Sequence, residues 1–465
     1  MKKLLLIFSI ILLSFIAPNN NFIMEWKNDV ELKPASFGFA FYDLDSNQYI
    51  AEHNKEKVLS AASTQKLLTT AIAIKTLGID HQFASTISYS GRIQEKTLRG
   101  DICIYPNKNP CLASKRFGKN VDEIVNEIDH FLKQKGIKFL SGIQIIDPTY
   151  ETETLPRTWL WEDIGNYYGA NPTGTILNEN IIELHFKSGA IGTPVTLVKT
   201  VPEMPWLKFH NRVLSSKVKK DLAYVFSEPQ SRYLTIEGTI PANKNNFTVK
   251  ASLPNPQKTL AYQIYSKLKE KGYALNGKYK VRKTSKKKTN IITTIKSASV
   301  KNIINQTNKK SVNILAENLL ENSYDYSGNK TGKLNWAKNY LKNTLKVNTE
   351  GMKIQDGSGL SGFNALSPEQ IVQVLTIMKD SKPFHESLPV AGESGTLKSF
   401  LVNSWAKGNL HAKSGSMRGV RSYAGYVKSK SGKNIAFAII INNANCSDRK
   451  TKHKIEDLLN HISNL

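Results

Sequence analysis

Ser63-Thr64-Gln65-Lys66 stands near the start of this chain of 465 residues, and two further motifs, Ser311-Val312-Asn313 and Lys413-Ser414-Gly415, follow it in that order. The first motif supplies a hydroxyl nucleophile with an amine nearby, the second a further hydroxyl and an amide, and the third a cation beside small residues. A single Ser-x-x-Lys match means little, because roughly four or five are expected by chance in a chain so rich in serine and lysine. The ordered trio predicts a serine acyl-transfer site.

The residues after Ser63 predict a helix. Apolar side chains recur with helical spacing from Leu67 to Leu77, and Gly78 is a typical C-terminal stop. Ser63 then stands where the helix begins, and Lys66 lies one turn on, on the same face. A neutral Lys66 amine could take the Ser63 proton if burial and neighbouring cations lower its pKa from the ordinary value of about 10.4. The alternative is an N-cap serine beside a solvated lysine.

Ser311-Val312-Asn313 comes directly before an apolar helical run over residues 314–320, so we expect it in the turn that precedes a helix. There the Ser311 hydroxyl would relay a proton between Lys66 and a leaving amine. The Asn313 amide would hold a substrate carbonyl. Taken alone, the motif is also typical of an ordinary helix start.

His411-Ala412-Lys413-Ser414-Gly415-Ser416 predicts a strand that ends in small residues, which let an extended peptide approach its backbone. Lys413 would offer a cation to a substrate carboxylate, with Gly415 beside it and hydroxyls from Ser414 and Ser416. The backbone N–H groups of Ser63 and Ser416 are candidates for an oxyanion hole. A solvated strand end is the alternative interpretation.

Both ends of the chain predict parts of one α+β domain, an antiparallel sheet flanked by helices. Strands are expected at residues 37–42, 48–52, 410–413, 423–428 and 434–442, and a helix at 452–465. Roughly 250 residues separate Ser63 from Ser311, which is enough for further inserted domains. We therefore assign residues 24–86 and 289–465 to the catalytic domain and residues 87–288 to inserted accessory structure.

Within the insertion, the patterns predict strands at residues 143–146 and 247–251 and helices at 121–134 and 259–271. The segment around Trp161 is rich in aromatic residues, so we expect it to be largely packed. Cys103 and Cys111 could close a short disulfide loop or remain two thiols, and both alternatives stay open.

Met1-Lys2-Lys3 and the apolar run over residues 4–17 predict a secretory signal within residues 1–20, or an uncleaved N-terminal anchor. The protein is therefore expected in the periplasm or elsewhere outside the cytoplasm. Its formal charge of +26, from 64 Lys and Arg against 38 Asp and Glu, would draw it to anionic cell-wall or membrane surfaces. A lysine-rich composition gives the same charge with no partner implied.

Other classes of site find no support in the sequence. No helix-turn-helix or zinc-finger pattern indicates nucleic-acid binding. None of the nine histidines stands in a His-Glu-x-x-His motif, and there is no Cys-x-x-Cys. We therefore expect no metal and no cofactor.

The motifs together resemble the class C low-molecular-mass penicillin-binding proteins, exported D-alanyl-D-alanine carboxypeptidases and endopeptidases that trim peptidoglycan stem peptides. The similarity runs from about residue 37 to residue 443 and extends beyond the trio. The additional segments are Tyr42-Asp43-Leu44-Asp45, Trp161-Glu162-Asp163-Ile164-Gly165-Asn166-Tyr167-Tyr168-Gly169-Ala170, Leu177-Asn178-Glu179-Asn180, Asp356-Gly357-Ser358-Gly359-Leu360, Leu388-Pro389-Val390-Ala391-Gly392 and Gly395-Thr396-Leu397.

The resemblance implies a penicillin-binding-protein/β-lactamase-like transpeptidase domain with large inserted accessory domains. It also implies a serine-type peptidase of cell-wall peptidoglycan that works through a Ser63 acyl-enzyme, needs no cofactor and is inhibited covalently by β-lactams. Carboxypeptidase and endopeptidase action both stay open. Two further alternatives are a β-lactamase-like hydrolase, against which the large insertion argues, and a non-catalytic wall sensor, against which the presence of Lys66 and Asn313 argues.

The chain departs from the family pattern at two motif positions and in one loop. Val312 stands where the second motif usually has Asp, and Ser414 stands in place of Thr but keeps the hydroxyl. Pro106-Asn107-Lys108-Asn109-Pro110-Cys111 replaces a Gly-rich turn. These departures affect local loop contacts rather than the reaction.

Overall fold

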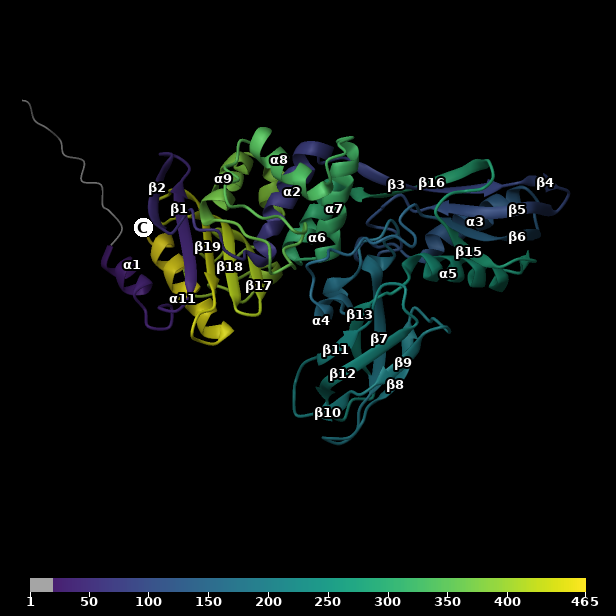
Figure 1. Ribbon diagram of the computed structural model, residues 1–465, viewed down its shortest axis with the longest axis horizontal. Helices are drawn as coiled ribbons and strands as arrows, with labels where there is room; N and C mark the ends of the chain where they lie inside the picture. The colour runs from purple at the N-terminus through teal and green to yellow at the C-terminus, as the bar shows by residue number, and fades with distance from the viewer. Residues whose placement is uncertain (1–19) are drawn as a thin grey trace, which may run out of the picture.

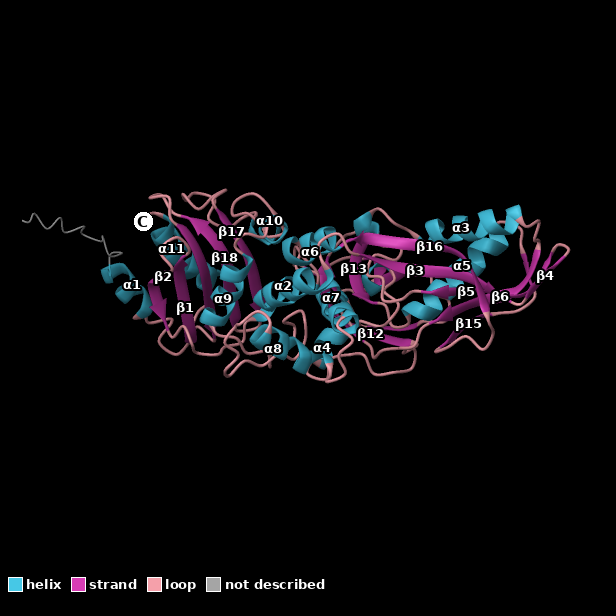
Figure 2. Ribbon diagram, turned by 90° about the horizontal axis from the view of Figure 1, so that it is seen from above, coloured by secondary structure: helices cyan, strands magenta, loops and turns pink. Residues whose placement is uncertain are grey.

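The computed structural model describes residues 20–465, so the signal or anchor expected within residues 1–20 falls almost wholly outside the described part. The molecule is elongated, with a sheet of five strands at one end and the sheets of the inserted region at the other (Figure 1). A view from above shows helices between the two (Figure 2). Across residues 20–465, no helix has the length and apolar character needed to cross a bilayer.

An antiparallel sheet of order β17-β18-β19-β1-β2 joins the two ends of the chain. The N-terminal hairpin therefore lies beside the last three strands, as the sequence predicted. The strands are β1 (Ser36–Asp43), β2 (Gln48–His53), β17 (Leu410–Met417), β18 (Val420–Lys428) and β19 (Asn434–Asn442).

Strand β17 is longer than the span 410–413 predicted for it, because it continues to Met417. It confirms the prediction that His411 to Ser416 form a strand that ends in small residues. Gly415 pairs with Ser422 and Ser416 with Arg421, because β18 offers a partner along the whole length. The third motif therefore lies inside a strand at the edge of the sheet.

Helices cover both faces of this sheet. They are α1 (Asn20–Lys27), α2 (Lys66–Leu77), α6 (Val300–Lys309), α7 (Asn313–Tyr326), α8 (Lys333–Asn343), α9 (Pro368–Met378), α10 (Lys382–Glu386) and α11 (Asp448–Ser463), with 3-10 turns η1 (Ala62–Gln65) and η5 (Gly395–Leu397). Alternation along β19 explains the arrangement. Ala436 and Ala438 belong to the core with α2 and α9, whereas Phe437 and Ile439 pack on the opposite face with α11. A strand buried on both faces has no polar side to show in its sequence.

The inserted region holds three further sheets. Its strands are β3 (Gln82–Ser90), β4 (Arg92–Gln94), β5 (Thr97–Tyr105), β6 (Phe139–Ile146), β14 (Ala274–Leu275), β15 (Tyr279–Arg282) and β16 (Thr289–Ser299) in the largest, β7 (Ile181–Lys187), β8 (Thr196–Val201) and β13 (Phe247–Ser252) in the second, and β9 (Lys208–Asn211), β10 (Leu214–Ser216), β11 (Leu222–Phe226) and β12 (Tyr233–Pro241) in the third. Its helices are α3 (Val121–Gln134), α4 (Trp161–Ile164) and α5 (Pro256–Glu270), with 3-10 turns η2 (Lys115–Phe117), η3 (Tyr167–Gly169) and η4 (Asn178–Asn180). β3 and β16 are antiparallel neighbours, so the chain enters and leaves this region along paired strands.

The prediction that the aromatic segment around Trp161 is largely packed is wrong for two of its aromatic side chains. Trp161 is 57% exposed and Tyr167 is 50% exposed. The reason is that α4 is a four-residue helix that lies against β11 at the surface. Elsewhere in the insertion, Cys103 and Cys111 are separate buried thiols. Burial raises the pKa of Cys103 to about 11 and that of Cys111 to about 12.

Candidate active site

Ser63 lies in the tight turn η1, directly before α2 begins at Lys66. The preceding residue, Ala62, has φ +46°, a left-handed conformation that side chains other than glycine adopt rarely. The turn therefore leaves Ser63 only half-buried, while Ala62 and Lys66 are buried. The Lys66 Nζ donates to Ser63 Oγ at 2.9 Å, so the predicted nucleophile and its base are in contact.

Lys66 is fully enclosed, with an exposed fraction of 0%. Besides Ser63 Oγ, its Nζ donates to Asn313 Oδ1 at 2.6 Å and to the Ser358 carbonyl at 2.6 Å. Burial lowers the pKa of Lys66 to about 7, against the opposing effect of the Asp356 and Glu317 carboxylates. Burial thus makes the neutral amine accessible near pH 7, as a proton acceptor requires.

Lys413 is also fully buried and does not line the cleft. Its Nζ donates to Ser311 Oγ at 2.9 Å and to the Ser414 carbonyl at 2.6 Å. Burial, together with the nearby Lys66 cation, holds the pKa of Lys413 well below its usual value. The Lys413 side chain therefore reaches the cleft through the Ser311 hydroxyl, which lines it.

Asn313 connects the base to the inserted region. Its Oδ1 accepts from Lys66, while its Nδ2 donates to the Tyr168 carbonyl at 2.8 Å. Tyr168 follows α4 in the aromatic segment, so this segment reaches the catalytic residues. The pairing restricts which way the Asn313 amide faces, because its Oδ1 and one of its two Nδ2 hydrogens are occupied.

Gly415 sits where β17 passes the nucleophile turn. A Cβ at this position would lie 2.2 Å from Ser422 Oγ, 2.7 Å from the Ala61 carbonyl oxygen and 3.0 Å from the Ser63 nitrogen. Only a residue without a side chain allows the strand to approach Ser63 so closely. Beside it, the exposed Ser416 and the Ser63 backbone face the same cleft. Ser414 donates its hydroxyl to Thr396 Oγ1 at 2.7 Å.

A cleft of about 670 Å³ brings four of the predicted residues together, Ser63, Ser311, Asn313 and Ser416. Lys66, Lys413, Ser414 and Gly415 are outside its lining, and both lysines hold residues that line it. The opposite wall comes from the insertion and includes Leu160, Glu162, Asp163, Tyr167, Tyr168 and Tyr224.

Sequence reasoning missed several residues that complete this site. Glu162 forms an ion pair with Arg418 at 3.6 Å across the cleft. Trp159 donates its indole N–H to Asp356 at 2.8 Å. The Asp356-Gly357-Ser358-Gly359-Leu360 segment was recognised as a family landmark, but no local pattern indicated that the Ser358 carbonyl would bind Lys66. Such contacts join segments far apart in sequence, which periodicity cannot reveal.

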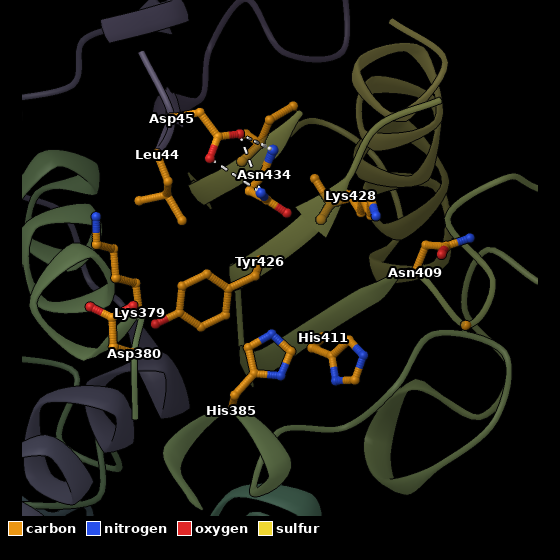
Figure 3. Close-up of a pocket in the computed structure, with 13 residues that line it drawn as sticks. Leu44, Asp45, Lys379, Asp380, His385, Asn409, His411, Tyr426, Lys428 and Asn434 are labelled. Carbon is orange, nitrogen blue, oxygen red and sulfur yellow. Dashed lines mark hydrogen bonds between the residues drawn. The ribbon is translucent and has the colours of Figure 1, made fainter. Parts of the chain in front are cut away.

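A second cavity, of about 420 Å³, lies at the other end of β17 and contains none of the predicted residues (Figure 3). His385 and His411 lie there with ring centroids 4.4 Å apart and ring planes tilted by 42°, and His385 stacks on Tyr426. Burial lowers the pKa of both histidines, that of His411 to about 4. Both imidazoles are therefore neutral at pH 7, and the acyl-transfer chemistry has no residue here.

Known proteins resemble the chain over nearly its whole length. Residues 20–463 match the model of the D-Ala-D-Ala carboxypeptidase 3 (S13) family. The chain is 23% identical over 449 residues to the D-alanyl-D-alanine carboxypeptidase DacB of Haemophilus influenzae, which covers 93% of this chain and 90% of the relative. It is 24% identical over 439 residues to the D-alanyl-D-alanine carboxypeptidase of an Actinomadura strain, and the alignment covers 89% of this chain and 79% of that relative. The crystal structure of penicillin binding protein 4 from H. influenzae has a TM-score of 0.80 at 20% identity and covers 95% of this chain and 99% of its own, which confirms the predicted fold class.

Proposed function

The chain belongs to the D-Ala-D-Ala carboxypeptidase 3 (S13) family, and we propose that it cleaves the terminal D-alanyl-D-alanine bond of peptidoglycan stem peptides through a Ser63 acyl-enzyme. The observation that carries the proposal is the 2.9 Å contact between Lys66 Nζ and Ser63 Oγ, with the pKa of Lys66 lowered to about 7. This contact places an amine of lowered pKa against a hydroxyl, which is the arrangement that activates a serine nucleophile.

Acylation begins when neutral Lys66 takes the proton of Ser63. The Ser63 oxygen forms a bond to the carbonyl carbon between the two D-alanines, and the backbone N–H groups of Ser63 and Ser416 hold the oxyanion. The bond from carbon to nitrogen then breaks. The amine of the leaving D-alanine receives the proton through the Ser311 hydroxyl, which Lys413 orients.

Deacylation repeats these steps with water. Lys66 takes a proton from the water, whose oxygen bonds to the acyl carbon. The bond from that carbon to the Ser63 oxygen breaks, and Ser63 regains a proton from Lys66. Asn313 holds the substrate carbonyl, Lys413 acts on the terminal carboxylate from behind Ser311 with Ser414 next to it on β17, and Gly415 gives the substrate room along that strand.

β-Lactams are proposed to acylate the same serine, because their strained amide presents a carbonyl carbon to Ser63 in the same way. A structure of penicillin binding protein 4 from H. influenzae is described as complexed with a β-lactam, and it has a TM-score of 0.74 to this chain at 20% identity. That shared fold supports the geometry of the proposal. The way in which the chain is divided also supports the proposed acyl-enzyme site. All five strands of the sheet beside Ser63 come from residues 36–53 and 410–442, on the two sides of the insertion.

The protein is proposed to work outside the cytoplasm, on the cell wall, with residues 24–86 and 289–465 as the peptidase domain and 87–288 as the insertion. Its excess of 26 positive charges supports association with anionic wall or membrane surfaces.

Penicillin labelling tests the assignment. We expect one covalent adduct per chain, mapped by mass spectrometry to the peptide that contains Ser63, and none on Ser63→Ala. An adduct on another serine, or no adduct with folded wild-type protein, removes the catalytic assignment. Incubation with defined muropeptides then separates the two activities: loss of one D-alanine indicates a carboxypeptidase, and cleavage of a cross-link indicates an endopeptidase.

A further inference from the structure

Glu317 is a fully buried carboxylate in the second layer of the site, and none of the motifs includes it. It lies on α7, one turn after Asn313, with an exposed fraction of 0%. Within residues 20–465, no Lys, Arg or His side chain forms an ion pair with it at 4.0 Å or less. A buried carboxylate without such a partner is costly, so its presence calls for a role.

The hydrogen bonds of Glu317 lead to the base. Its Oε1 accepts the Gly357 N–H at 3.0 Å and the Ser358 N–H at 2.8 Å, and its Oε2 also lies 3.0 Å from the Gly357 nitrogen. The carbonyl of Ser358 in turn accepts from Lys66 Nζ at 2.6 Å. Thr69, on the same helix as Lys66, donates to the Gly357 carbonyl at 2.6 Å. One peptide segment is thus fixed by α7 on one side and by α2 on the other.

We propose that Glu317 is a positioning residue for the base. Its carboxylate holds the segment Gly357-Ser358 so that the Ser358 carbonyl keeps Lys66 Nζ against Ser63 Oγ. Its negative charge also favours the protonated form of Lys66. This inference rests on the proposed function and extends it to a residue that does not touch the substrate.

The charges around Glu317 and Lys66 come from three other elements. Asp356, in the loop after α8, acts on both Glu317 and Lys66. Lys333, the first residue of α8, acts on Glu317, and Lys413 on β17 lies close to Lys66. Burial and the nearby Asp356 raise the pKa of Glu317, while Lys333 opposes them. Glu317 in turn raises the pKa of Lys66 and thereby limits the effect of burial.

Because Glu317 raises the pKa of Lys66, its removal should shift the pH dependence of acylation in a known direction. Acylation needs neutral Lys66, so its rate rises with pH around the Lys66 pKa, which is about 7. Removing the Glu317 charge lowers that pKa further. The midpoint of the rate profile of Glu317→Gln should therefore move toward acid, by about one pH unit, the lower end of what an adjacent charge produces. His385 and His411 do not account for this limb, because burial lowers the pKa of both.

The experiment measures penicillin acylation rates from pH 5 to 9 for wild type, Glu317→Gln, Glu317→Asp and Glu321→Gln, each checked for folding by circular dichroism. Glu321 is the matched control, because it stands one turn later on α7 and pairs with Lys108 and Lys333 at 2.8 and 2.9 Å, outside the groups that act on Lys66. Glu321→Gln should keep the wild-type midpoint. Glu317→Asp retains the charge but withdraws the carboxylate from Gly357 and Ser358, so the plateau rate should fall at an unchanged midpoint.

A Glu317→Gln profile that is lower at every pH but has the wild-type midpoint overturns the electrostatic part of the inference, and equal shifts in Glu317→Gln and Glu321→Gln overturn its specificity. If Glu317→Gln does not fold, Glu317→Asp decides the positioning part: a wild-type plateau rate overturns it. Absence of acylation in the wild type is a different outcome, because it removes the proposed function itself.

Discussion

Replacing Gly415 with alanine tests whether the close approach of β17 to the nucleophile turn is needed for catalysis. The new Cβ would lie 3.0 Å from the Ser63 nitrogen and 2.7 Å from the Ala61 carbonyl oxygen, distances that real Cβ atoms essentially never show or show rarely. Both atoms belong to the backbone, so no side-chain rotation relieves the contact. The turn that carries Ser63 has to move away from the strand.

The size of the movement follows from the contacts. An ordinary van der Waals contact of a Cβ is 3.4–4 Å, so the Ser63 nitrogen must retreat from 3.0 Å to that range. Displacement of a catalytic group by about 1 Å can cost about 100-fold in rate. We therefore expect Gly415→Ala to acylate about 10- to 100-fold more slowly, with an overpacking cost in unfolding free energy of about 1–3 kcal/mol.

Gly362→Ala is the matched control. Gly362 lines the same cleft, has no positive φ, and would place its Cβ with no atom within 4 Å. Stopped-flow acylation by a chromogenic cephalosporin gives the rates, and urea unfolding gives the stabilities. The reasoning is refuted if folded Gly415→Ala acylates as fast as Gly362→Ala.

Two further sets of variants test the two lysines and the link to the insertion. Arginine stays protonated at ordinary pH, so Lys66→Arg should acylate at or near background, more than about 100-fold below wild type. A Lys66→Arg enzyme near the wild-type rate would show that the base lies elsewhere. Lys413→Arg keeps the cation, so its acylation rate should be higher than that of Lys413→Ala. Trp159→Phe removes the 2.8 Å hydrogen bond to buried Asp356 and should lower the unfolding free energy by about 1.5–3 kcal/mol in urea titrations, and an unchanged midpoint and slope would exclude a structural role for that bond.

The sequence predicted what depends on local pattern and order. Helix α3 and strand β19 have the predicted bounds, because amphipathic spacing or an unbroken apolar run identifies each. The contact between Lys66 and Ser63 was predicted for a similar reason, since helical spacing alone places the two side chains on one face. The sequence failed where the partner is distant. It treated Lys413 as a cation open to substrate, yet the fold encloses it, because the turn between α6 and α7 brings Ser311 onto its amine.

The insertion is part of the site rather than an attachment to it. Among the polar contacts that join it to the catalytic region, three lie at or directly behind the cleft: Tyr168 to Asn313, Trp159 to Asp356 and Glu162 to Arg418. The first orients the amide that contacts Lys66, the second fixes the loop whose Ser358 carbonyl holds the same amine, and the third spans the cleft. The motifs therefore supply the reacting groups and two of the three acceptors of the Lys66 amine, and the third acceptor, the Ser358 carbonyl, lies outside them. Because Lys66 can serve as a base only while it is held against Ser63 and kept dry, the geometry of catalysis depends on insertion residues that lie about 100 to 150 positions away from the first and second motifs in sequence.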